Sequence, residues 1–110
     1  MQTVVTMKLI TLLALSSMAT KASEIDPAYA QHLADAIKKA ENSRHHPYGI
    51  EIHCKDPRRV CLNTIRHAWR DWQAEGCPGS FIAYLGNRYC PESVDAVGNR
   101  NWKRNVPSLM

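Results

Sequence analysis

The sequence predicts one small, mainly α-helical domain with at most a short extended segment over residues 48–53. Three stretches carry apolar residues at the three- and four-residue spacing that lines one face of a helix. Each stretch follows a residue that caps helix starts, namely Asp26, Asp56 or Ser80. A chain of 110 residues has room for a single domain.

The first helix is expected to begin at Pro27, which suits the first helical position because its missing N–H costs nothing there. Its apolar stripe comprises Ala30, Leu33, Ala34, Ile37 and Ala40. Glu41 continues this stripe, where a plain amphipathic helix would carry an apolar side chain. Partial burial and the negative end of the helix dipole would both raise the pKa of Glu41, as a proton donor near neutral pH requires. The alternative is a helix-end glutamate that points into water.

The second helix is expected to begin at Pro57 and to end at Gly76, after a loop in which Pro47 stops the first helix. Residues 48–53 alternate weakly and predict one short strand or an extended edge. The buried face of the second helix is predicted to comprise Val60, Cys61, Ile65, Ala68, Trp69 and Trp72. Because Trp69 and Trp72 share this face, we expect them in the core rather than on a sugar-binding surface.

The third helix is expected to run from Ser80 to Cys90-Pro91, with Phe81, Ile82, Leu85 and Tyr89 on its buried side. From Glu92 onward the helical periodicity is lost, which predicts an irregular polar loop. Residues 99–105 combine three asparagines and three basic residues with Trp102. Such a loop offers hydrogen bonds and a stacking face, so Asn101 and Trp102 are candidate sugar-binding residues. The alternative is that Trp102 and Val106 fix the C-terminal segment to the core.

Residues 26–50 resemble the lysozyme-like superfamily and are most similar to its soluble lytic transglycosylase branch. The resemblance is carried by an apolar helix that ends in Glu41, by Ser43, and by Gly49-Ile50 after a polar loop. In that branch the glutamate is the catalytic acid, so the resemblance assigns this role to Glu41. The candidate substrate-binding residues around it are Ser43, Tyr48, Gly49 and Ile50.

The resemblance to this branch is incomplete. Ser43 stands one position later than the family's serine, and Glu51-Ile52 replaces the usual Met-Gln. Residues 61–106 also resemble small secreted bacterial proteins of the same lysozyme-like type, through segments 61–65, 81–82, 85–91 and 99–106. This second likeness assigns no chemistry to the residues that carry it.

Together the resemblances imply an exported enzyme that cleaves glycosidic bonds between the amino sugars of peptidoglycan strands, with Glu41 as general acid and base. A hydrolase normally adds a second carboxylate, for which the loop offers Glu51 and Asp56. A lytic transglycosylase needs none, because the substrate's own hydroxyl attacks. Tyr48, Tyr84 and Tyr89 are open alternatives for positioning the substrate. The competing hypothesis is a non-catalytic secreted module, stabilised by disulfides, that binds cell-wall glycan or a protein partner.

The first 22 residues have the pattern of a secretory signal peptide: Lys8, an apolar run over 9–15, then small residues. Residues 23–110 would then form the mature domain, periplasmic or secreted and without a stable membrane anchor. That domain keeps 12 basic and 10 acidic residues, a net charge of +2, which gives no sign of nucleic-acid binding. The five histidines lack the spacing of a zinc site, and no other metal site or cofactor is indicated.

Four cysteines in an exported chain predict disulfides. A single helix over residues 57–75 would be about 28 Å long and would keep Cys77 far from Cys54 and Cys61. A helix between Cys77 and Cys90 would separate that pair as well. One bridge among Cys54, Cys61 and Cys90 remains, of which Cys61–Cys90 would join the second and third helices. Cys77 would then be a free thiol or would form an intermolecular disulfide.

Overall fold

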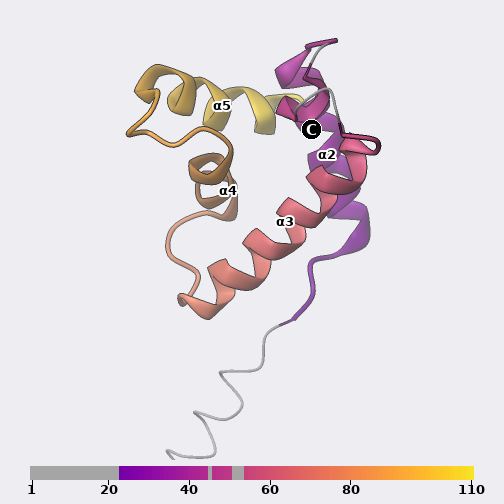
Figure 1. Cartoon of the computed structure of the whole chain (residues 1–110). Helices are drawn as coiled ribbons and strands as arrows, with labels where there is room; N and C mark the ends of the chain where they lie inside the picture. Colours follow the sequence, from indigo (N-terminus) through magenta and orange to yellow (C-terminus); the bar gives the residue numbers. More distant parts are fainter. Residues whose placement is uncertain (1–22, 45, 51–53) are drawn as a thin grey trace, which may run out of the picture.

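A computed structural model describes residues 23–44, 46–50 and 54–110, and this part of the chain is built from helices (Figure 1). Its elements are α2 (Pro27–Glu41), the 3-10 turn η1 (Pro47–Gly49), α3 (Pro57–Ala74), α4 (Phe81–Tyr89) and α5 (Ala96–Ser108). The predicted mainly α class is therefore confirmed. The predicted signal peptide, residues 1–22, lies outside the described residues. No helix in the described ranges is long and apolar enough to cross a membrane.

The first three long helices begin at the predicted caps. The side chain of Asp26 accepts a hydrogen bond from the Tyr29 amide, and Asp56 accepts one from Arg59, both at 3.1 Å. Ser80 Oγ accepts one from the Ala83 amide at 3.1 Å. Each cap satisfies an amide that has no partner within its helix, which stabilises the helix by about 1 kcal/mol.

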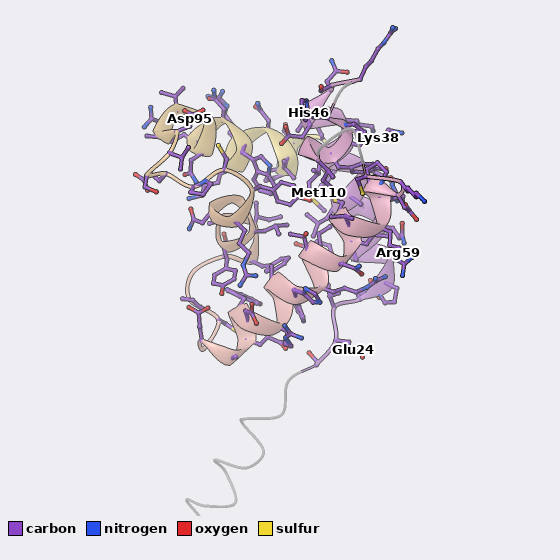
Figure 2. All side chains as sticks on the ribbon, in the orientation of Figure 1. Glu24, Lys38, His46, Arg59, Asp95 and Met110 are labelled. Atoms are coloured by element: carbon purple, nitrogen blue, oxygen red, sulfur yellow. The ribbon has the colours of Figure 1, made fainter. Side chains whose placement is uncertain are left out.

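Helix α5 corrects the prediction of an irregular loop after Glu92. Asp95, at the outer end of α5 in Figure 2, caps the helix by accepting from the Gly98 amide at 2.8 Å. The buried face of α5 consists of Asn99, Trp102 and Val106, which are at helical spacing. The pattern is hard to see in the sequence because its first member is polar. The Asn99 amide is nevertheless satisfied, since it donates to the Asn87 side chain at 3.0 Å and to the Cys90 carbonyl at 2.7 Å.

The segment predicted as a strand begins instead with the turn η1. Tyr48 lies in this turn with a left-handed backbone angle, φ 60°, and is buried. Ile50 has an extended backbone. Residues 51–53, the rest of the predicted strand, lie outside the described part of the chain.

The four α-helices in the described part of the chain pack in a ring. Helix α2 contacts α3, α3 contacts α4, α4 contacts α5, and α5 returns to contact α2, as Figure 1 shows. The ring encloses a core to which every helix contributes fully buried side chains, including Leu33, Ile37, Ile65, Leu85 and Val106. The return of α5 brings its middle turns to the C-terminal end of α2, where Glu41 lies.

Trp69 and Trp72 pack in the aromatic part of the core, as predicted. Their rings lie 4.9 Å and 5.6 Å from the ring of Phe81, measured between centroids. Both side chains are half-buried against the core. Val60 was predicted on the same buried face but is 39% exposed, so that part of the prediction is wrong.

All four cysteines are free thiols in this structure. The sulfur of Cys61 is buried and accepts a hydrogen bond from the Tyr89 hydroxyl at 3.0 Å. The sulfur of Cys90 instead faces the start of α5, 3.9 Å from the Asp95 carbonyl. The predicted Cys61–Cys90 bridge is therefore not formed here. Cys77 is exposed, and its intermolecular disulfide stays a prediction.

Gly86 provides a test of the contact between α4 and α5. A Cβ atom added to this buried glycine would lie 2.9 Å from Cε3 of Trp102. Glycine-to-alanine exchange within a helix ordinarily stabilises a protein by up to about 1 kcal/mol. Here we expect Gly86→Ala to lower the free energy of unfolding by about 1–3 kcal/mol, because the buried indole ring of Trp102 cannot move away from the added methyl group. Urea unfolding measures the change, and unaltered or increased stability would contradict the close contact of α4 with Trp102.

Candidate functional site

Glu41 lines a pocket of about 260 Å³ between the ends of α2 and α4 and the middle of α5. The lining residues are Ala40, Glu41, Tyr89, Cys90, Gly98, Asn101, Trp102 and Asn105. Three predicted site residues, Glu41, Asn101 and Trp102, are thus brought together from opposite ends of the sequence. A glutamate that points freely into water, the alternative considered above, does not describe this arrangement.

The carboxyl group of Glu41 is half-buried, and its electrostatics follow from that position. Burial raises its pKa above the ordinary value, because a buried carboxylate loses hydration. The nearby indole N–H of Trp102 offsets part of this rise and lowers the pKa. Within residues 23–44, 46–50 and 54–110 that N–H does not reach hydrogen-bonding geometry with an acceptor, so its effect on Glu41 is weaker than that of a formed hydrogen bond. The net direction is a carboxyl group that holds its proton to higher pH.

Gly49 closes one side of the Glu41 carboxyl group. A Cβ atom at this position would lie 3.2 Å from the carboxyl carbon and 3.4 Å from both oxygens. Gly49 also has a left-handed backbone angle, φ 71°, which favours glycine. The turn η1 therefore brings the predicted Glu41 and Gly49 into direct contact, and a side chain at Gly49 would crowd the acid.

None of the four predicted residues of the loop, Ser43, Tyr48, Gly49 and Ile50, is among the residues that line this pocket. Ser43 Oγ accepts from the His46 amide at 3.0 Å and shapes the loop. The buried Tyr48 hydroxyl accepts from Arg58 at 3.0 Å, and Arg58 also bonds Asp35 at 2.9 Å. Ile50 is half-buried and packs against the core. In this structure Ser43, Tyr48 and Ile50 support the loop that carries Gly49.

Tyr89 is the tyrosine that lies at the pocket. Its ring stacks on Trp102 with centroids 5.5 Å apart and an angle of 23° between the planes. Burial raises the pKa of its hydroxyl, with further contributions from Cys61 and Glu41, so the side chain stays an uncharged phenol. Tyr84, by contrast, hydrogen-bonds Glu75 and Arg88 on the surface.

Asn105 is a pocket residue that sequence reasoning did not single out. It stands four positions after Asn101, so the two amides share one face of α5. That spacing becomes informative only when residues 96–108 are recognised as a helix. Asp95 followed by Asn99, Trp102 and Val106 is the sequence signal that would have revealed it.

The pocket offers proton transfer and hydrogen bonding. Glu41 is the one acid among the described lining residues, and Asn101, Asn105 and Trp102 carry N–H groups. No three His, Cys, Asp or Glu side chains gather as a metal site in the described ranges, which omit His45 and His53. A larger pocket of about 510 Å³ lies beside Glu24, at the end of the molecule opposite His46 (Figure 2), and holds none of the predicted site residues.

Comparison with protein-family models finds no match, and neither curated proteins nor solved structures yield a similar protein. The likeness to lysozyme-like proteins therefore rests on the residues quoted above.

The raised pKa of Glu41 predicts that the stability of the wild type relative to Glu41→Gln depends on pH. Because the folded state holds this proton to higher pH than the unfolded chain, ionisation of Glu41 opposes folding. That penalty grows as pH rises from the unfolded-state pKa through the folded-state pKa. We expect Glu41→Gln to unfold at a higher temperature than the wild type near neutral pH, with the difference vanishing below about pH 4. Thermal unfolding across pH measures it.

The matched control is Glu92→Gln, which changes an exposed carboxyl group in the loop before α5. It should leave the unfolding temperature close to that of the wild type throughout. If Glu41→Gln is less stable than the wild type near neutral pH, the assigned direction of the pKa shift is wrong.

Proposed function

We propose that this chain is a small exported enzyme that cleaves peptidoglycan strands, with Glu41 as its general acid and base. The observation that carries the proposal is the half-buried Glu41 carboxyl group, with raised pKa, in a pocket also lined by Tyr89, Asn101 and Asn105. A general acid works best when its pKa lies near the operating pH. Burial moves Glu41 in that direction.

In the first step the protonated Glu41 gives its proton to the glycosidic oxygen, and the bond from that oxygen to the anomeric carbon breaks. In the second step the Glu41 carboxylate takes a proton from a hydroxyl group of the same sugar. That hydroxyl oxygen bonds to the anomeric carbon, which gives an anhydro sugar and returns Glu41 to its protonated form. One carboxyl group therefore serves both steps.

The lining of the pocket favours this transglycosylase route over hydrolysis. Glycosidases that add water normally use two carboxyl groups, about 5 Å apart or more than about 6.5 Å apart. Among the described lining residues Glu41 is the one acid. The loop carboxylate of Asp56 is engaged as the cap of α3, and Glu51 lies outside the described ranges.

The size of the pocket supports a short contact with the glycan. Its 260 Å³ lies just under the range of about 300–1,000 Å³ that is common for drug-sized ligands. We infer that the pocket takes about one sugar ring and that the strand continues outside it. The small excess of basic residues suits an anionic cell wall.

The small pocket also favours a second candidate, a secreted module that binds glycan or a protein partner without cleaving it. Such a module needs the amide and aromatic groups of the pocket but no proton transfer. The enzyme therefore loses its cleavage products when the Glu41 proton donor is removed. The binding module forms no cleavage products with or without that proton donor.

Digestion of purified peptidoglycan separates these candidates. We expect the wild type to release anhydro-muropeptides and Glu41→Gln to be slower by at least about 100-fold, because the proton donor is lost. Mass spectrometry identifies the products, and Glu92→Gln should match the wild type. Hydrated ends would indicate a hydrolase and a second carboxylate. Equal products from the wild type and Glu41→Gln would remove Glu41 from the mechanism, and no products from either would favour the binding module.

A further inference from the structure

The larger pocket, beside Glu24, shares no described lining residue with the Glu41 pocket. Its volume of about 510 Å³ lies within the range of about 300–1,000 Å³ that is common for small-molecule sites. One wall is formed by residues 23–27 and the other by one side of α3, at the end of the molecule opposite His46 in Figure 2. The proposed function leaves this pocket without a role.

The wall formed by residues 23–27 is fixed to α3. Trp69 Nε1 donates to the Ser23 carbonyl at 3.1 Å, and Gln73 Nε2 donates to Ser23 Oγ at 3.0 Å. The Ser23 amide in turn donates to Gln73 Oε1 at 3.2 Å. Ile25, two residues further on, is buried in the core. The pocket is therefore formed before any ligand arrives, which lowers the free-energy cost of binding.

The lining of this pocket carries an excess of basic groups. Arg66 and Arg70 stand four residues apart on α3, so they share one face of the helix, and His67 also lines the pocket. Glu24 is the one acid of the described lining and forms no ion pair with either arginine. Like charges at this spacing repel each other, so an anion between the two arginines would be stabilised.

The charges of the two arginines are not balanced by their neighbours in the described ranges. No carboxylate there forms an ion pair with Arg66, whose guanidinium group donates to the uncharged Asn63 side chain at 3.4 Å. Arg70 approaches Asp71 through Nε at 3.5 Å, but Asp71 is shared with Arg88 at 2.5 Å. Both guanidinium groups therefore keep N–H donors for a further acceptor.

The rest of the lining is largely apolar and comes from Ile25, Pro27 and Trp69. The Trp69 ring is held in place, because it packs on Phe81 with centroids 4.9 Å apart and donates its N–H to the Ser23 carbonyl. A bare inorganic anion would leave this apolar surface in contact with water. A ligand that fills the pocket therefore combines an anionic group with an apolar body.

We propose that this pocket binds a small organic anion, whose carboxylate or phosphate group bridges Arg66 and Arg70 while its apolar body lies against Trp69. A guanidinium group can donate two parallel hydrogen bonds to either kind of anion, so the arginine pair suits both. The site goes beyond the proposed function, because it uses no group of the Glu41 pocket. It requires that affinity depend on both the charge and the apolar body of the ligand.

NMR titration of the full chain with four probes tests the site. Benzoate and phenyl phosphate carry a ring and an anionic group, benzamide carries the ring without the charge, and inorganic phosphate carries the charge without the ring. We expect the Trp69 indole N–H signal to shift with benzoate or phenyl phosphate and to stay nearly fixed with benzamide. The Trp102 indole, at the other pocket, is the internal control. The phenyl anion that binds more tightly identifies the anionic group.

Three results of the titration would overturn the proposal. The first is a Trp69 signal that moves with neither phenyl anion. The second is an equal shift with benzamide, which would remove the role of the charge. The third is inorganic phosphate that binds as tightly as the better phenyl anion, which would remove the role of the apolar body.

Charge-removing variants give a second, independent readout. Arg66→Gln/Arg70→Gln should weaken binding of the better phenyl anion by about tenfold, the effect of losing two exposed ion pairs. The matched control Arg59→Gln/Arg100→Gln removes two exposed arginines outside the pocket and should bind as the wild type does. Equal weakening in both double variants would indicate attraction to net charge alone and would overturn the site. If Arg66→Gln/Arg70→Gln does not fold, the four probes decide alone.

Discussion

The burial of Trp102 is the interaction on which the rest of the structure depends. Its ring lies between α4 and α5, where Gly86 leaves it room and Tyr89 stacks on it. With the ring in place, α5 can return to α2 and complete the core. The pocket exists only because of this return, since Glu41 comes from α2 and the amides of Asn101 and Asn105 come from α5.

The same arrangement shows how a small helical protein can contain an acid of altered strength. The turn η1 encloses the Glu41 carboxyl group from a second side, because Gly49 lies close against it. The left-handed angle of Tyr48 in that turn is maintained by its burial and by the hydrogen bond from Arg58. The environment of Glu41 is thus set by a loop that the core holds in place.

Much of the fold could be predicted from the sequence, because caps and apolar stripes act over short distances. Asp26, Asp56 and Ser80 marked three helix starts that the structure confirms. Helix α5 was missed because Asn99 occupies its buried face, and the partners that satisfy this amide come from α4 and the residue after it. The sequence could predict Glu41, Gly49, Asn101 and Trp102 as candidate residues but could not show which tyrosine lies beside Trp102. Such pairings depend on how the helices pack.

The pocket combines the first and the last described helices, and this order has a consequence for biosynthesis. A chain emerging from the ribosome presents α2 long before α5. Glu41 then lies at the end of an unpacked helix, exposed to water, with an ordinary acid strength. The pocket therefore forms only after α5 has emerged and docked against α2 and α4, so the Glu41 carboxyl group gains its enclosed environment at a late stage of folding.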